Sequence, residues 1–279
     1  MAQYSYDTWD QLIDDLNTDS PNLTYEQINS LKSGGKFTKI KYHGKNLTLK
    51  TKGLIAPFGA KENQFENNPM KKTIEFELPR EDDVCDESNK NEVALFKLKQ
   101  VLTALHDKIK RDILKDDYQR EWLGIKGKSK KITNANIDLV LADIIKNNDS
   151  DKWRPRFKAK FPHMKDSATF QIWDENKKEI ISPPLNLTAE NEETYVSLEK
   201  IIPRRTEIRI AVIDLSSIWI INDKVGSTFN IRTLRIAKIP ELASGKCIVD
   251  SDDDDDDESQ SKLQGVEVIS DSDDDDDSD

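Results

Sequence analysis

The final 30 residues limit most strongly what this chain can fold into, because nearly all of their charge has one sign. Residues 250–279 contain 16 acidic side chains and one base, Lys262, and so carry a charge of −15. Subtracting this from the formal net charge of −11 leaves +4 for residues 1–249. Such a run cannot bury enough apolar surface to offset the entropy lost on ordering. We therefore expect a mildly basic folded body and a disordered acidic tail, for which a role in solubility alone is the simpler alternative.

The body begins with helical patterns and then changes to strand patterns. Residues 7–17 and 24–32 predict two short helices, the second opened by Thr24 with Gln27 at capping-box spacing. Residues 36–52 alternate between polar and apolar around a turn, which predicts a β-hairpin with its lysines along one face.

A helical block then divides the strand patterns of the body. Residues 91–118 show apolar side chains at helical spacing, and a basic linker leads to a second predicted helix near 134–147. Strand patterns flank this block, at 73–78, 156–161, 168–173, 207–213, 218–221 and 229–239. This order favours an α+β fold, an OB-like antiparallel β-barrel or sheet with a helical N-terminus and a helical insertion.

The same patterns divide the chain into five sections. They are an N-terminal helical section at 1–33, the first part of the OB-like β domain at 34–80, the helical insertion with its basic linker at 81–150, the second part of the β domain at 151–240, and the acidic tail at 241–279.

The sequence offers little for catalysis or for metal binding. It has no CxxC pair, no HExxH motif and no phosphate-cradling glycine loop, and its three histidines are scattered. Acidic pairs such as Asp14-Asp15 and Asp116-Asp117 fall on the polar faces of predicted helices, where solvated charge is the ordinary explanation. We therefore expect no enzymatic activity, no metal and no cofactor.

Cysteine usage and hydropathy bear on the compartment. Cys85 and Cys247 lie far apart, and the segment after Met1 lacks a signal-peptide pattern, so we expect a reducing, intracellular setting. No apolar run approaches the ~20 residues needed to cross a bilayer, so we expect no membrane contact.

The stretch from Trp153 to Phe161 is the most informative for function. As a strand, it places Arg156, Lys158 and Lys160 on one face and the apolar residues between them on the other. The cations then follow one another at ~6.7 Å, a spacing suited to the phosphates of an extended single strand. Lysines of the predicted hairpin and arginines of the last strand repeat the arrangement, and nearby aromatic rings are expected to stack on bases.

The residues that we expect to contact nucleic acid are Lys39, Lys41, Tyr42, Lys50, Lys52, Trp153, Arg154, Arg156, Lys158, Lys160, Trp173, Arg204, Arg205, Arg209, Arg232 and Arg235. Each of them also has a plainer explanation, because outward positions of any soluble sheet are charged and aromatic residues usually belong to the core. We expect Phe157, Phe161 and Trp219 in the core, and Trp153 exposed.

In its order of elements, residues 30–240 resemble the OB-fold single-stranded DNA-binding proteins of large eukaryotic DNA viruses. The resemblance rests on the N-terminal helical section, the lysine-bearing hairpin, the helical block, the strand Pro155–Lys160, the segment Ile180–Leu185 and the terminal hairpin Glu207–Ile239. It implies coating of single strands in viral DNA replication, recombination or repair, in the host nucleus or a cytoplasmic viral factory. The acidic end is similar to the partner-recruiting tails of phage and bacterial single-strand binders, although it does not finish in a hydrophobic residue.

Two short apolar patches of the tail precede its acidic runs. They resemble SUMO-interacting motifs, in which a β-branched segment adds to a sheet edge, and their residues are Ile248, Val249, Val266, Val268 and Ile269. Serines with acids downstream resemble acidophilic kinase sites, and these are Ser251, Ser270 and Ser272.

The basic body and the acidic tail together predict a sequence-tolerant binder of single-stranded DNA or RNA. A cationic groove should also attract the tail, so the tail is expected to compete with nucleic acid and, once displaced, to recruit replication or repair proteins. The alternative is an acidic-tailed chaperone or a SUMO-binding nuclear scaffold that does not bind nucleic acid.

Overall fold

The computed structural model describes residues 3–31, 34–63, 71–125, 131–147, 153–164, 167–181 and 197–237. Their fold is α+β with mostly antiparallel strand pairs, helices near the N-terminus and a helical insertion, as predicted. The predicted tail at 241–279 lies outside the described residues, together with its partner-binding and phosphorylation residues. None of the described helices has the length and apolar character needed to span a membrane.

The first part of the body contains most of the short strands. Its elements are β1 (Gln3–Ser5), the 3-10 helix η1 (Tyr6–Thr8), α1 (Trp9–Asn17), β2 (Leu23–Tyr25), β3 (Asn29–Ser30), β4 (Lys36–Thr38), β5 (Ile40–Tyr42), β6 (Lys45–Asn46), β7 (Thr48–Thr51), β8 (Leu54–Ala56), β9 (Ala60–Asn63) and β10 (Lys71–Glu77).

Helices follow, and then the longest strands. These elements are α2 (Lys90–Ile113), α3 (Asp116–Leu123), the 3-10 helix η2 (Ile137–Leu139), β11 (Ile145–Lys146), β12 (Arg156–Lys160), β13 (His163–Met164), β14 (Ser167–Ala168), β15 (Gln171–Trp173), β16 (Glu179–Ile181), α4 (Leu198–Ile201), β17 (Thr206–Ile221) and β18 (Lys224–Ile236).

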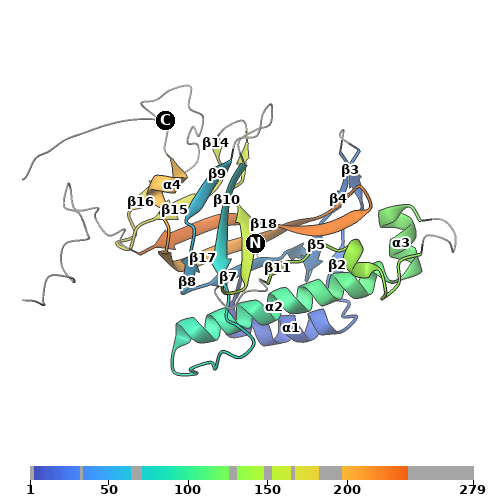
Figure 1. Cartoon of the computed structure of the whole chain (residues 1–279), viewed down its shortest axis with the longest axis horizontal. Helices are drawn as coiled ribbons and strands as arrows, with labels where there is room; N and C mark the ends of the chain where they lie inside the picture. Colours follow the sequence, from blue (N-terminus) through green and yellow to red (C-terminus); the bar gives the residue numbers. More distant parts are fainter. Residues whose placement is uncertain are drawn as a thin grey trace, which may run out of the picture. The chain divides into compact units, whose positions relative to one another are not determined.

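The long hairpin of β17 and β18 organises the main sheet (Figure 1). Its turn consists of Asn222 and Asp223, both with positive φ (51° and 59°), as the type I′ hairpin turn requires. β17 is one continuous strand, where the sequence predicted two. Register shifts against β18 bend it, so its first half pairs with β7 and β8 and its second half pairs with β4.

The strand pairs nearly close the sheet into the OB-like barrel that the sequence predicted. β18 pairs with β12, β12 with β10, and β10 with β9. β8 precedes β9 by a tight turn and pairs with β17, which brings the series back to the hairpin.

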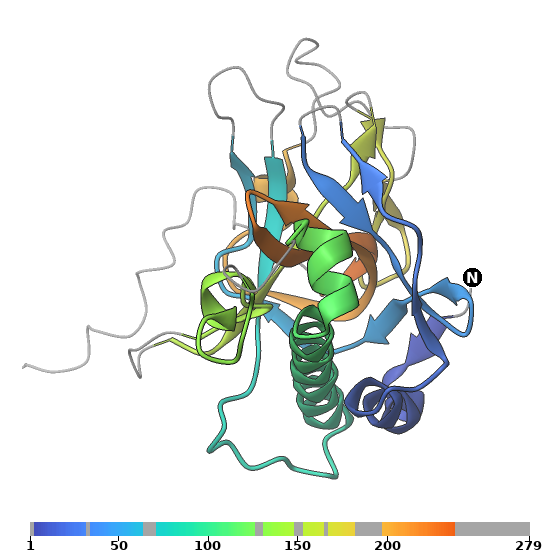
Figure 2. The same ribbon diagram turned by 90° about the vertical axis from the view of Figure 1, so that its right-hand side faces the viewer.

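Helix α2 runs beneath the sheet with α1 beside it (Figures 1 and 2). It begins where the Asn89 side chain accepts hydrogen bonds from the backbone N–H groups of Asn91 and Glu92. The apolar residues that predicted this helix are all fully buried: Leu98, Val101, Leu102, Leu105 and Ile109. The helix predicted to reach residue 118 ends at Ile113, and α3 follows after a short break.

The helix predicted at 24–32 is wrong, because this segment forms β2 and β3, which pair with β5 and β4. Long-range contacts override its local capping-box spacing. The Tyr25 hydroxyl donates a hydrogen bond to the buried Asp112 carboxylate of α2 (2.7 Å), and its ring packs edge-on against Tyr118 and Trp122. Burial raises the pKa of Tyr25 well above its usual range, and the Asp112 charge raises that pKa further.

The helix predicted at 134–147 is also wrong. The segment forms a turn, η2 and then extended chain whose backbone partners lie on β18 and β12. The Ala142 N–H donates to the Val225 carbonyl (2.8 Å), the Val225 N–H donates to the Val140 carbonyl (2.9 Å), and β11 pairs with β12. Partners so distant in sequence cannot be inferred from local spacing.

The hairpin predicted over 36–52 forms only at its tip. β5 and β6 pair around His43 and Gly44, but β4 pairs with β17, and β7 pairs with β1 and β17. The lysines of this segment therefore do not share one face, contrary to the prediction.

Candidate nucleic-acid interface

Two aromatic side chains and a glycine lie beside one another on three strands near the turn of the long hairpin. Phe37 on β4, Trp219 on β17 and Gly226 on β18 are neighbours in register. A Cβ on Gly226 would lie 2.6 Å from Cε2 of Trp219, so the indole rests directly on the glycine. The prediction that Trp219 lies in the core is wrong, because Ile218 and Ile220 take the buried face of β17 and Trp219 takes the other.

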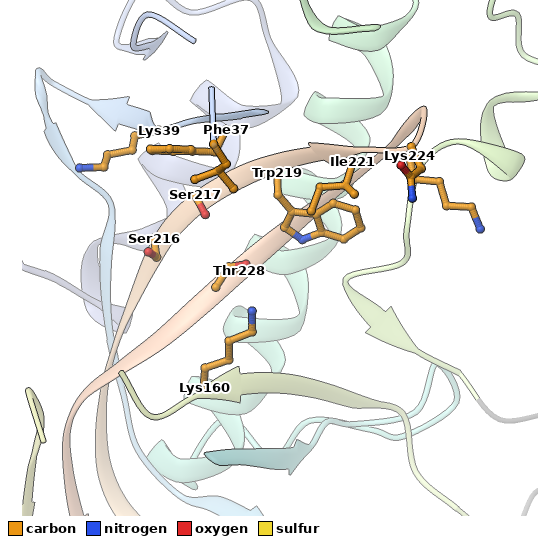
Figure 3. Close-up of a pocket in the computed structure, with 11 residues that line it drawn as sticks. Phe37, Lys39, Lys160, Ser216, Ser217, Trp219, Ile221, Lys224 and Thr228 are labelled. Atoms are coloured by element: carbon orange, nitrogen blue, oxygen red, sulfur yellow. The ribbon is translucent and has the colours of Figure 1, made fainter. Parts of the chain in front are cut away.

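Phe37 and Trp219 line a surface hollow of about 770 Å³. Leu31 and Ile221 add apolar surface to the hollow, and both are more than two-fifths exposed. Figure 3 shows Lys160 extending from β12 toward Trp219 and Thr228.

A second hollow of about 410 Å³ adjoins the first and shares Lys160, Trp219 and Thr228 with it. In the described residues, β12 and β18 pair only at Lys160 and Asn230, and the second hollow lies between these strands. We call the two hollows together the lysine groove. Its charged lining residues are Lys39, Lys71, Asp143, Lys146, Lys158, Lys160 and Lys224, and its aromatic ones are Phe37, Trp219 and Phe229.

The register of the neighbouring strands places lysines of β9, β10 and β12 close together. Lys61 on β9, Thr73 on β10 and Lys160 on β12 form one row across the sheet. Alternation along β10 places Lys71 on the exposed face and turns Lys72 inward, where it forms a buried ion pair of 2.5 Å.

The cations of the groove outnumber its anions. Asp143 is the one carboxylate among the lining residues that the structure describes. Lys39, Lys158, Lys160 and Lys224 have no ion-pair partner within 4.0 Å in the described part of the chain. No group of three or more His, Cys, Asp or Glu side chains there is arranged to hold a metal ion.

Loss of hydration and neighbouring positive charge lower the pKa of two groove lysines. Loss of hydration lowers the pKa of Lys160, and the charges of Lys71 and Lys158 lower it further. Loss of hydration also lowers the pKa of Lys158, which Glu75 opposes and the surrounding lysines reinforce. Linked anionic groups would relieve this repulsion by occupying the space between the lysines.

Comparisons with known proteins give a likeness in fold only. No family model matches the sequence, and the search of curated proteins finds no match. Three similar solved structures are of a single-stranded DNA-binding protein from bacteriophage Enc34. The structure in complex with ssDNA has a TM-score of 0.34 at 15% identity, over 80% of this chain and 98% of that chain. Its C-terminal truncation has a TM-score of 0.37 at 14% identity, over 77% of this chain and 95% of that chain.

The third of these structures has a TM-score of 0.34 at 13% identity, over 76% of this chain and 89% of that chain. These values are too low to carry a function from one protein to the other. The functional assignment therefore depends on the groove itself.

Three of the residues predicted to contact nucleic acid lie in the groove, namely Lys39, Lys158 and Lys160. The alternation predicted for β12 is confirmed, because the apolar residues between its cations are buried. Arg156 lies farther along the same face, where its guanidinium is 3.1 Å from the Glu75 carboxylate.

The other predicted residues of the segment 36–52 lie outside the groove lining. Tyr42 is 2% exposed and donates a hydrogen bond to Asp15 (2.8 Å), so burial removes the stacking surface expected of it. Lys41 is ion-paired with Glu26 (2.8 Å). The half-buried Lys50 lies on β7, and Lys52 Nζ lies 4.7 Å from the centre of the Tyr6 ring.

The predicted arginines also lie outside the groove lining. Four of them are ion-paired: Arg154 with Asp83 (2.9 Å), Arg156 with Glu75 (3.1 Å), Arg209 with Glu175 (3.5 Å) and Arg232 with Asp214. Trp173 and Arg235 are neighbours where β15 pairs with β18, at the opposite end of the long hairpin from Trp219. Arg204 and Arg205 are exposed after α4.

Besides Trp219, which was predicted to lie in the core, the groove residues that were not predicted as part of the site include Phe37, Lys71, Lys146 and Lys224. For Phe37 the signal was present, because a strand through residues 37–39 places Phe37 and Lys39 on one face. The three lysines enter the groove through long-range strand pairing, for which the sequence holds no comparable local signal.

We predict that Gly226→Ala displaces the Trp219 indole. The backbone of Gly226 does not have positive φ, so alanine is tolerated there and the new methyl group overlaps the ring. Tryptophan fluorescence should change in Gly226→Ala, and the change should vanish when Trp219→Phe is also present. Gly44→Ala is the control: nothing lies within 4 Å of its Cβ position, and because Gly44 has φ +72° the variant also shows whether backbone strain alone changes the emission. Unchanged emission in Gly226→Ala would contradict this account of the site.

Proposed function

We propose that this chain binds single-stranded DNA in the lysine groove, without sequence preference and without catalysing a reaction. The observation that carries the proposal is that lysines without ion-pair partners in the described chain lie beside a half-buried indole in one continuous groove. Phosphates supply the negative charge that these lysines lack. Stacking of a base on an aromatic side chain contributes ~1–3 kcal/mol.

The indole favours a single strand over a duplex. In a duplex each base is paired and stacked between its neighbours, so a base face reaches Trp219 only after unstacking, which costs a few kcal/mol. A single strand presents its base faces freely while its phosphates reach Lys160 and Lys71. Stacking tolerates any sequence because every base has a π-face. RNA offers the same groups, so we expect it to compete for the same groove.

Oligonucleotide binding across a salt series tests the proposal directly. Each phosphate contact contributes about −0.7 to the slope of log K against log salt for a single strand. We predict that Lys160→Gln weakens binding at low salt and makes this slope shallower by about 0.7. Lys178→Gln, an exposed lysine of the β15–β16 turn outside the groove, should change neither quantity.

The absence of detectable oligonucleotide binding by the intact protein at low salt would contradict the proposal. That result is the one expected of the alternative, an acidic-tailed chaperone or nuclear scaffold. A slope change that is equal in the Lys160 and Lys178 variants would instead remove the groove as the binding site.

We further propose that the acidic segment 250–279 competes with DNA for the groove. The segment carries −15 on the same chain as the groove. Attachment to one chain raises the effective concentration of such a segment to as much as the millimolar range. Lys39, Lys158, Lys160 and Lys224 have no carboxylate partner among the described residues, which supports this role.

We predict that removing residues 250–279 tightens binding to an unstructured oligonucleotide several-fold at low salt, because a competing polyanion is lost. The gain should shrink as salt rises, since salt screens the interaction of the segment with the groove. Replacing the acidic residues of the segment with Asn and Gln should reproduce the gain at unchanged length. Equal affinity of the intact, truncated and neutralised proteins would exclude the competition.

The cellular roles of the tail stay predictions of the sequence. They are recruitment of replication, recombination or repair proteins once DNA has displaced the tail, binding of SUMO through residues 248–249 and 266–269, and phosphorylation of its serines. The viral setting that the family resemblance implies is likewise a prediction.

A further inference from the structure

A second aromatic cluster lies beyond the lysine groove, next to the start of β12. Trp153 is 43% exposed, and its ring centre lies 5.6 Å from that of Phe58 in the turn between β8 and β9. Lys61 Nζ and the Arg156 guanidinium lie 4.6 and 4.7 Å from the centre of the Phe58 ring. An exposed indole thus packs against a ring that two cations contact.

We propose that Trp153 is a second base-stacking site and that a bound single strand runs from the lysine groove along β12 to this indole. The inference rests on the proposed function and adds to it the path and the minimum length of the strand. It assigns Phe58, Lys61 and Arg156 to the far end of that path.

The cations of β12 provide the connection between the two aromatic sites. Arg156, Lys158 and Lys160 project from the same face of this strand. Successive cations are therefore ~7 Å apart, and the three span ~14 Å. Phosphates of one strand could then contact each cation in turn, taking the place of Glu75 at the Arg156 guanidinium.

Contacts of Trp153 itself and of the two residues that follow it hold the indole in place before any strand binds. Arg154, the next residue, is ion-paired with Asp83 (2.9 Å), and the Pro155 carbonyl accepts a hydrogen bond from the Leu78 N–H (2.8 Å). Phe58 packs against the ring itself. A side chain that is already positioned loses little conformational entropy on binding, which favours its use as a stacking surface.

The position of the cluster predicts a dependence on strand length. A short oligonucleotide can occupy the lysine groove alone, whereas a longer one can also reach Trp153, and the second contact is then intramolecular. OB folds cover ~4–16 nucleotides, so oligothymidines from dT4 to dT16 sample both situations.

The test compares the wild type, Trp153→Leu and Trp153→Phe with this series. We expect Trp153→Leu to bind the longest oligonucleotides about 10-fold more weakly, since one stacked base is lost, and to bind dT4 within about twofold of the wild type. Trp153→Phe retains an aromatic ring and should recover most of the affinity. The salt slope should be the same in all three proteins, because no phosphate contact has been removed.

Equal affinity of the wild type and Trp153→Leu at every length would overturn the inference and leave the proposed function intact. So would an equal loss at every length, because a general defect of the protein, rather than a lost distant contact, would produce it. No binding of any oligonucleotide by the wild type would instead overturn the proposed function itself.

Discussion

The crowding of positive charge on one face of the barrel is the constraint on which the rest of the account depends. Lys158 and Lys160 lie two residues apart on β12, and Lys71 lies close enough to lower the pKa of both. Two charges 7 Å apart in water repel by ~0.6 kcal/mol. Full burial of one phenylalanine contributes ~1.5–3 kcal/mol. The buried Phe157, next to Lys158 in sequence, can therefore offset their repulsion, and the fold tolerates a surface that is suited to bind a polyanion.

The strands around the groove separate stability from binding by using their two faces differently. On β17, Ile218 and Ile220 are buried while Trp219 lies over Gly226 and lines the groove. On β10, Lys72 turns inward to a buried ion pair while Lys71 lines the groove. Substitutions of the groove residues should therefore change binding more than they change the free energy of unfolding.

How far the sequence could predict this structure depended on the range of the interactions involved. Local periodicity was sufficient for β12 and for the buried stripe of α2, because alternation and helical spacing are properties of a few consecutive residues. It failed at 24–32 and 134–147, where pairing with distant strands decides the conformation. The residues of the candidate site show the same difference between local and long-range interactions. Lys158 and Lys160 were predicted from alternation, whereas Lys71 and Lys146 enter the groove only through the register of β10 and β11.

Protection of lysines from acetylation by a bound single strand, read by mass spectrometry on the full chain, distinguishes the lysine groove from the rest of the surface. The account predicts that an oligothymidine slows acetylation of Lys39, Lys71, Lys158 and Lys160, while exposed lysines outside the groove, such as Lys45 and Lys178, react at an unchanged rate. Equal protection of all these lysines, or protection confined to Lys45 and Lys178, would contradict the assignment of the groove as the binding surface.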